Sequence, residues 1–469
     1  MKQTGKKIYI AFFLVLCMIP SVGLALGGWE DSAENTERAA VPSLTEDGHV
    51  NLLFFRHAGE WFEDNFAWRE ELVTANAKLQ AGLFGVSAQD EVILGTDGWL
   101  YYADSLNDFT GREQLSDRAL FDIARSAKIT QEYCSYLGAD YLFVIAPNKA
   151  TLYPEYMPSY LSHRVSDTSN RIRLSTFLEQ EGVNALDLTD ILEEEARRRK
   201  ESPQADDLLP YLYHKRDSHW TSEGAAMASE AILDALGTEH SSFSKADRTI
   251  RRDFSGDLDR MLYPADVTLE EEIQYDPPPA YHYVGEVEST FDYSIQTVSD
   301  GAGISLLMYR DSFGNALLPF LAKSYAQGYF SRATPYDVLF DVNQYGATAV
   351  IVENAERNLP RLAARAPVLQ GLPSGHAIDE AAVRKVDAHV EVELEEANPY
   401  FTKVTGVLTE PPEAGELILA DPGDGILYEA IPVHQLQSGE ESFVLYVPAQ
   451  DYPAEAVTAK ETQVYCVKE

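Results

Sequence analysis

Segments typical of strands and of helices alternate along the middle of this chain, and this alternation limits the folds that it can adopt. Residues Tyr141–Ala146 (YLFVIA) form a continuous apolar run, the pattern of a strand that is buried on both faces. Similar reasoning predicts further strands at 92–94, 99–102, 183–187, 304–309 and 349–353, and helices at 51–85, 116–136, 168–180, 221–236 and 315–325. The alternation predicts an α/β fold with a mostly parallel sheet and helices on both of its faces.

The pattern changes near residue 388, where short segments begin to alternate apolar and polar residues. HVEVELEE, FTKVTGVLT and ESFVLYVP are examples, and clusters of Pro or Gly separate such segments. A period of two without helical segments predicts a small all-β, sandwich-like domain. We therefore divide the chain into an N-terminal segment at 1–28, an α/β domain at 29–385 and a β domain at 386–469.

The N-terminus has the composition of an export signal. Lys2, Lys6 and Lys7 precede the uncharged residues 8–26, and acidic residues follow from Glu30 onward. At about 1.5 Å per residue this segment spans about 28 Å, close to the thickness of the bilayer core. Lysines before it and acids after it predict a globular part outside the cytoplasm. The chain is then held at the cell membrane by a single-pass signal-anchor, or secreted if the segment is a cleaved signal peptide.

Charge and cysteine content narrow the possible partners and sites. Acidic residues outnumber basic ones by 75 to 37, and the formal net charge of −38 argues against nucleic acid as a partner. Of the three cysteines, Cys17 lies in the apolar N-terminal segment, so at most one disulfide, Cys134–Cys466, can form. A cysteine-based zinc site is excluded, and the ten histidines show no HxH or HExxH spacing that would indicate another metal site.

Asp217 and His219 are the first candidate catalytic residues, two positions apart in the sequence RDSHWT just before the helix predicted at 221–236. On a loop, both side chains are able to face one cavity. The carboxylate then accepts the imidazole N–H and leaves the other ring nitrogen free as a base. The alternative is an ordinary helix-entry loop in which Asp217 accepts backbone N–H groups.

Ser312 is the second candidate, in the sequence RDSFG, where the buried strand 304–309 ends and a helix begins. A serine at such a turn lies at the carboxyl edge of the sheet, where open α/β folds place their sites. The following helix offers backbone N–H groups to a developing oxyanion, although Ser312 or Asp311 is alternatively only the helix N-cap. Together, Ser312, His219 and Asp217 supply a nucleophile, a base and an orienting acid.

These segments resemble the AlgX/AlgJ family of O-acetyltransferases of alginate and exopolysaccharide biosynthesis, and the related DHHW proteins. The resemblance covers about residues 30–360. It is carried by DNFAWR at Asp64–Arg69, VILGTDGWLYY at Val92–Tyr102, PNKATLYPE at Pro147–Glu155, DSHWT at Asp217–Thr221, RDSFG at Arg310–Gly314 and ERNL at Glu356–Leu359. The sequence departs from the pattern at Arg310, where the superfamily commonly has Gly, and at Ser218, where the DHHW signature has His.

The resemblance implies a circularly permuted SGNH-hydrolase-like fold, which is flavodoxin-like with three layers. It implies that Ser312 takes up an acetyl group and passes it to a hydroxyl of an exported polysaccharide. His219 acts as base and then as acid, and Asp217 orients it. The acetyl donor in such systems is a membrane-bound O-acyltransferase, and the reaction needs no cofactor.

Three further residues are candidates for contacts with the oxyanion or the substrate. Asn148, directly after the strand at 141–146, is a candidate oxyanion donor, and Lys149 is a candidate ligand of a carboxylated sugar. Arg310 either contacts an acidic polysaccharide or closes off the backbone approach to the nucleophile. For Asn148 and Lys149 the alternative is hydrogen bonding within the loop and solvation.

Three functions stay open on the sequence alone. They are an anchored O-acetyltransferase, a carbohydrate esterase (deacetylase) with the same triad, and a non-catalytic glycan-binding protein. The first two differ in whether water reaches the acyl-enzyme, and the third requires no nucleophile at all.

Overall fold

The computed structural model describes residues 2–25, 40–46, 49–65, 68–161, 164–166, 168–243, 246–334, 336–394, 399–457 and 462–468. Residues 26–39, and Phe66 and Ala67 of the DNFAWR motif, lie outside the described residues.

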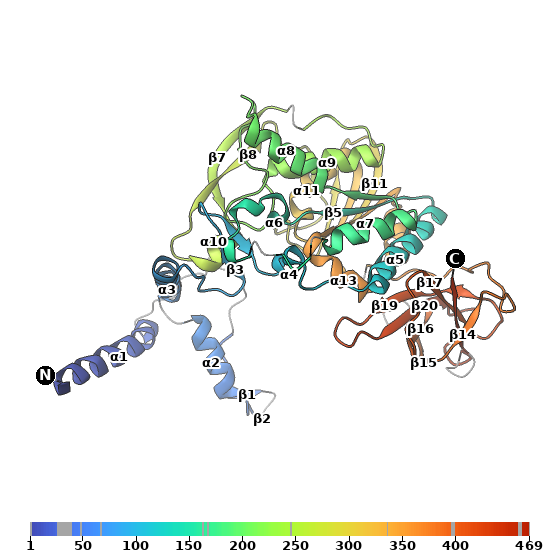
Figure 1. Cartoon of the computed structure of the whole chain (residues 1–469), viewed down its shortest axis with the longest axis horizontal. Helices are drawn as coiled ribbons and strands as arrows, with labels where there is room; N and C mark the ends of the chain where they lie inside the picture. The colour runs from blue at the N-terminus through green and yellow to red at the C-terminus, as the bar shows by residue number, and fades with distance from the viewer. Residues whose placement is uncertain are drawn as a thin grey trace.

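A seven-stranded sheet forms the centre of the α/β part of the chain (Figure 1). Its order is β6-β5-β13-β11-β12-β10-β9. The first five strands are mutually parallel, and β10 and β9 extend one edge in antiparallel pairing. The bounds are β5 Asp140–Ala146, β6 Ala185–Asp187, β9 His282–Tyr283, β10 Ser294–Val298, β11 Gly303–Tyr309, β12 Tyr325–Ser331 and β13 Ala349–Ala355. The predicted mostly parallel sheet is therefore confirmed.

Helices cover both faces of this sheet, because successive side chains of a strand point to opposite faces. In β5, Leu142 and Val144 belong to one buried cluster, and Phe143 and Ile145 belong to another. The first cluster is completed by α6 (Lys149–Leu152), α8 (Thr189–Glu201), α9 (Ser222–Ala235) and α11 (Gly314–Ser324). The second is completed by α5 (Asp117–Tyr136), α7 (Asn170–Gln180), α12 (Val338–Tyr345) and α13 (Leu359–Ala363). The result is the expected three-layer, SGNH-hydrolase-like arrangement.

The N-terminal part of the chain adds helices and short strands outside the central sheet. They are α1 (Lys2–Ala25), β1 (Thr45–Glu46), β2 (His49–Val50), α2 (Phe54–Asn65), α3 (Arg69–Phe84), β3 (Val92–Leu94), β4 (Leu100–Tyr102) and α4 (Ser105–Thr110). The helical segment predicted at 51–85 is thus two helices, and Trp68 has left-handed backbone angles (φ 60°) directly before α3. Among the helices that the structure describes, none combines the length and the hydropathy needed to cross a membrane.

Two four-stranded antiparallel sheets make up the C-terminal part of the chain, in the orders β14-β21-β17-β18 and β15-β16-β20-β19. Val404 and Phe443 of one sheet share a buried cluster with Ile418 and Val464 of the other, so the sheets pack face to face. The bounds are β14 Arg384–Val386, β15 Ala388–Leu394, β16 Phe401–Leu408, β17 Glu416–Asp421, β18 Tyr428–Glu429, β19 Ile431–His434, β20 Glu441–Pro448 and β21 Gln463–Lys468. The predicted sandwich-like β structure is confirmed.

The β structure packs directly on helix α5. Ile431 and Val433 of β19 belong to the same buried cluster as the apolar side chains of α5, and Phe121 of α5 packs with strands of the other sheet. Arg125 of α5 donates to both carboxylate oxygens of Glu429, at 2.5 and 2.8 Å. This interface is apolar with a buried ion pair, unlike the surface of a loosely tethered module.

Several local elements were not predicted from the sequence. Residues 248–298, for which no helix or strand was predicted, contain the hairpin formed by β7 (Arg248–Ser255) and β8 (Leu269–Tyr275), the helix α10 (Asp257–Leu262) between them, and the edge strands β9 and β10. Strand β12 was missed because its mixed sequence YAQGYFS has no apolar alternation. Cys134 and Cys466 are buried free thiols, so the one disulfide that the sequence allows is not formed.

Candidate functional site

Ser312 lies in the turn between β11 and α11, at the carboxyl edge of the central sheet. The carboxylate of Asp311 holds this turn. Its Oδ1 accepts the backbone N–H of Phe313 at 2.8 Å, and its Oδ2 accepts the N–H of Ala355 at 2.7 Å. Gly314 is required by close packing, since a Cβ there would lie 2.6 Å from Cβ of Arg310. The turn is therefore fixed to the ends of both β11 and β13.

Asp217 and His219 come from the loop that leads into α9. Thr221 caps this helix, because its side chain accepts the N–H of Gly224. Oδ1 of Asp217 accepts both the backbone N–H of His219 and its ring Nδ1–H, each at 2.8 Å. The helix-entry loop thus presents the imidazole in one fixed orientation.

The three side chains singled out in the sequence form one hydrogen-bonded chain. Nε2 of His219 lies 2.8 Å from Oγ of Ser312, on the opposite side of the ring from Asp217. With Nδ1–H donated to Asp217, Nε2 is left to accept the Ser312 proton. This is the geometry that a general base needs in order to activate a hydroxyl nucleophile.

Electrostatics favour a charged Asp217 beside this imidazole. Burial alone would raise the pKa of Asp217, but its hydrogen bond from His219 and the positive charge of that ring outweigh burial and hold the pKa well below its usual range. Burial would likewise lower the pKa of His219, and the hydrogen bond and charge of Asp217 raise it above the ordinary histidine value. The pair therefore stabilises the imidazolium that forms when a serine proton is taken up.

Asp257, at the start of α10, is a fourth member of the site that sequence reasoning missed. Its carboxylate accepts the N–H and the hydroxyl of Ser218, at 2.7 and 2.6 Å, and its own backbone N–H donates to Asp217. Its Oδ2 lies 3.5 Å from Nδ1 of His219. The sequence around Asp257 gives no signal of a site, because a single acidic residue outside any recognised motif does not indicate one.

Lys149 does not occupy the position expected of a sugar ligand. Its ammonium is buried and donates to the backbone carbonyls of His214 and Lys215, at 3.1 and 3.0 Å, and to that of Asp217. Burial lowers its pKa to about 8, against the opposing negative charge of Asp217 and its acidic neighbours. Lys149 therefore supports the loop that carries Asp217 and His219.

Asn148 and Arg310 are also buried. The backbone N–H of Asn148 donates to Glu356 at 3.0 Å, and its side-chain Oδ1 has no donor among the described residues. Arg310 donates to Asn315 and to the carbonyls of Thr290 and Asp292, at 2.9 and 3.3 Å. Arg310 thus ties the nucleophile turn to a neighbouring loop.

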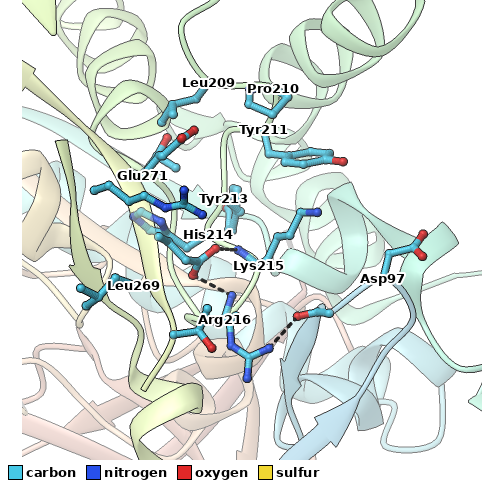
Figure 2. Close-up of a pocket in the computed structure, with 15 residues that line it drawn as sticks. Asp97, Leu209, Pro210, Tyr211, Tyr213, His214, Lys215, Arg216, Leu269 and Glu271 are labelled. Carbon is cyan, nitrogen blue, oxygen red and sulfur yellow. Dashed lines mark hydrogen bonds between the residues drawn. The ribbon is translucent and has the colours of Figure 1, made fainter. Parts of the chain in front are cut away.

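A pocket of about 520 Å³ lies beside the same loop, between the β3–β4 turn and β8 (Figure 2). Tyr211, Lys215 and Arg216 project from one wall, and Nζ of Lys215 lies 5.0 Å from the centroid of the Tyr211 ring. Arg216 donates to Asp259 at 2.7 Å, which anchors the loop to α10. Of the described residues that line this pocket, none belongs to the Asp217–His219–Ser312 chain.

Two groups among the described residues bring possible metal ligands within 4.8 Å of one another. One is Asp217, His219 and Asp257, in which Nδ1 of the imidazole is already hydrogen-bonded to Asp217. The other is Asp122, His434 and Glu441 at the α5 interface. Arg118 pairs with Asp122 there at 2.7 Å, so the charge that a cation would supply is partly present.

Comparison with known proteins finds a family match within the α/β region. Residues 92–292 match the model of the SGNH hydrolase-like domain of acetyltransferase AlgX. This segment includes Asp217 and His219 and ends before Ser312. A probable alginate O-acetylase AlgJ of Pseudomonas putida is 27% identical over 152 residues, which are 32% of this chain and 34% of that protein. The match thus spans about one third of the length of this relative.

Solved structures show a similar arrangement at low sequence identity. PatB1 of Bacillus cereus is 14% identical, with a TM-score of 0.43, and the match covers 57% of this chain and 96% of that one. AlgX of Pseudomonas aeruginosa is 12% identical, with a TM-score of 0.35, over 84% of this chain and 97% of that one. The family match at 92–292 confirms, for that segment, the resemblance indicated by the sequence motifs: it is similar to the SGNH hydrolase-like domain of acetyltransferase AlgX.

Proposed function

We propose that this protein is an extracytoplasmic O-acetyltransferase that moves an acetyl group onto hydroxyls of an exported polysaccharide. The observation that carries the proposal is the hydrogen-bonded chain from Asp217 through His219 to Ser312, with both contacts at 2.8 Å. The family match supports acetyl transfer as the reaction, and the AlgJ relative supports a polysaccharide as the acceptor.

In the first half-reaction Ser312 takes the acetyl group. Its Oγ attacks the acetyl carbonyl carbon while the hydroxyl proton moves to Nε2 of His219. The bond between that carbon and the donor's oxygen then breaks, and His219 returns the proton to the leaving oxygen. Asp217 stays ionised throughout and stabilises the imidazolium.

In the second half-reaction a sugar hydroxyl takes the place of the donor. His219 accepts the hydroxyl proton as the sugar oxygen attacks the acetyl carbon. The bond from this carbon to Oγ breaks, and the proton passes from His219 to Ser312. The enzyme is regenerated and the sugar carries an acetyl ester.

Location and partners belong to the same proposal. Lys2, Lys6 and Lys7 before the uncharged residues 8–26 support export of the chain, either anchored at the membrane or released. A membrane-bound O-acyltransferase is the proposed donor of acetyl groups. We assign the chemistry to residues 29–385 and a glycan-facing or capping role to residues 386–469, where Tyr400 has 78% of its surface exposed.

Acetylation of oligosaccharides by the purified full chain tests this function. Wild-type protein given 4-nitrophenyl acetate and a mixture of oligosaccharides is expected to yield acetylated sugar, detected by mass spectrometry, and Ser312→Ala is expected to yield none. Acetate with no acetylated sugar would instead assign the protein as an esterase. Equal background rates in both proteins would leave the triad without a catalytic role and favour a glycan-binding protein.

A further inference from the structure

Arg357 is a half-buried cation beside the proposed site, and its side chain pairs with no carboxylate in the described part of the chain. Its guanidinium lies over two aromatic rings, 5.0 Å from the centroid of Phe313 and 5.4 Å from that of Tyr102. Phe313 is the residue after Ser312, and its ring lies 5.0 Å from the His219 ring. In a chain with twice as many acids as bases, an arginine held by rings alone is unusual.

The backbone around Arg357 is fixed relative to Ser312. Arg357 is the middle residue of the short helix η3 (Glu356–Asn358), which follows β13 directly. Glu356 accepts hydrogen bonds from the N–H of Asn148 and the hydroxyl of Thr151, at 3.0 and 2.6 Å. Asn358 donates to Oδ2 of Asp311 at 2.6 Å, the same carboxylate that holds the nucleophile turn. The guanidinium is therefore positioned by a framework shared with Ser312.

The charge of Arg357 opposes proton uptake by His219. Asp217 and Asp257 raise the pKa of this imidazole, and the nearby positive charge of Arg357 lowers it. By itself this cation disfavours the imidazolium that acyl transfer requires. Asp217 and Asp257 outweigh this effect in the resting site, and a negative charge next to the guanidinium would reduce it further.

We propose that Arg357 is a catalytic residue whose guanidinium receives an anionic oxygen at the Ser312 site, a role that rests on the proposed acyl transfer. When Oγ of Ser312 bonds to the acetyl carbon, the electron pair of the carbonyl bond moves to its oxygen, and the proton of Ser312 moves to Nε2 of His219. The N–H groups of Arg357 donate to this new oxyanion. The same chemistry also suits a carboxylate on the sugar acceptor, and the assays below distinguish the two sources.

Substitutions in the full-length protein test this role. Arg357→Gln removes the charge, and Arg357→Lys keeps the charge without the planar fork of donors. Arg361→Gln is the matched control, because Arg361 lies one helical turn further on and is largely exposed, 3.9 Å from Asp104. With 4-nitrophenyl acetate, Arg357→Gln is expected to slow nitrophenolate release about 100-fold. Arg357→Lys is expected to slow it less, and Arg361→Gln not at all.

Two further readouts separate a charge effect from a structural one. The pH at which acylation is half-maximal is expected to rise in Arg357→Gln, because removing this cation removes one of the influences that lower the pKa of His219. If Arg357→Gln loses acylation, the anion that Arg357 binds is the acetyl oxyanion. If this variant loses only the transfer onto carboxylated oligosaccharides and still acetylates neutral ones, the anion is the carboxylate of the acceptor.

The results that would overturn the role of Arg357 differ from those that would overturn the proposed acetyl transfer. Suppose that Ser312→Ala is inactive but that Arg357→Gln and Arg361→Gln have equal rates and equal pH profiles. This result would overturn the role of Arg357 and leave the proposed function standing. Equal rates in wild type and Ser312→Ala would overturn both. If Arg357→Gln fails to fold, a wild-type rate in a folded Arg357→Lys contradicts the requirement for the guanidinium fork.

Discussion

Oδ2 of Asp257 lies 3.5 Å from Nδ1 of His219, which places a second carboxylate beside an imidazole that Asp217 already orients. Burial and the negative charge of Asp217 raise the pKa of Asp257, and its hydrogen bonds from Ser218 act in the opposite sense. Asp257 therefore adds negative charge next to the base without displacing the residue that holds it.

Asp257→Asn is expected to move the pH profile of acylation to lower pH. The negative charge of Asp257 contributes to the raised pKa of His219, so removing it lowers that pKa. Acylation needs neutral His219, and its half-maximal pH falls with the pKa. The measurement is the rate of nitrophenolate release between pH 5 and 9.

Asp266→Asn serves as the control for this shift, because Asp266 is an exposed partner of Lys78 away from the site. It should leave the profile unchanged. A profile of Asp257→Asn that moves to higher pH would contradict the assigned sign.

Lys149→Met is expected to lower the free energy of unfolding by about 3 kcal/mol, because it removes the donor to the buried carbonyls of His214 and Asp217, whereas the Lys215 carbonyl keeps the N–H of Leu100. Equilibrium unfolding in urea measures this loss. The control is Lys200→Met, whose exposed pair with Glu155 contributes about 0.5 kcal/mol or less. Unchanged stability together with a raised KM for carboxylated acceptors would restore the sugar-binding role that the sequence suggested.

Arg125→Ala is expected to destabilise the protein by about 3 kcal/mol, because it leaves Glu429 without its cation at the interface between α5 and the β structure. Arg173→Ala is the comparison, since Arg173 pairs with an exposed Asp117 and its loss should cost less than about 1 kcal/mol. The measurement is the urea concentration at the midpoint of unfolding, compared between the two variants. Equal midpoints would mean that the β structure is docked by its apolar contacts alone.

The sequence predicted the fold best where a strand is buried on both faces. β5 and β11 are continuous apolar runs and were recognised, whereas β12 contains Gly328 in a mixed sequence. A Cβ at Gly328 would lie 2.6 Å from Oγ1 of Thr297 on β10. The reason for that glycine lies in a neighbouring strand, which the local pattern does not reveal.

The site was predictable where its residues are close in sequence or stand at a recognisable turn. Asp217 and His219 are two positions apart, and Ser312 follows a buried strand. Asp257 and Arg357 reach the site from elements that come together only in the folded chain. For Lys149 the sequence left a sugar contact and loop hydrogen bonding both open, because its partners are carbonyls more than sixty residues further along.

A covalent acetyl-enzyme is the most direct test of the central claim. Full-length protein is mixed with 4-nitrophenyl acetate, quenched in acid within the first turnover, digested and analysed by mass spectrometry. The account predicts one acetyl group on Ser312 in the wild type and none at this position in His219→Ala, which lacks the base. Acetyl groups only on lysines, or equal labelling of Ser312 in both proteins, would contradict it.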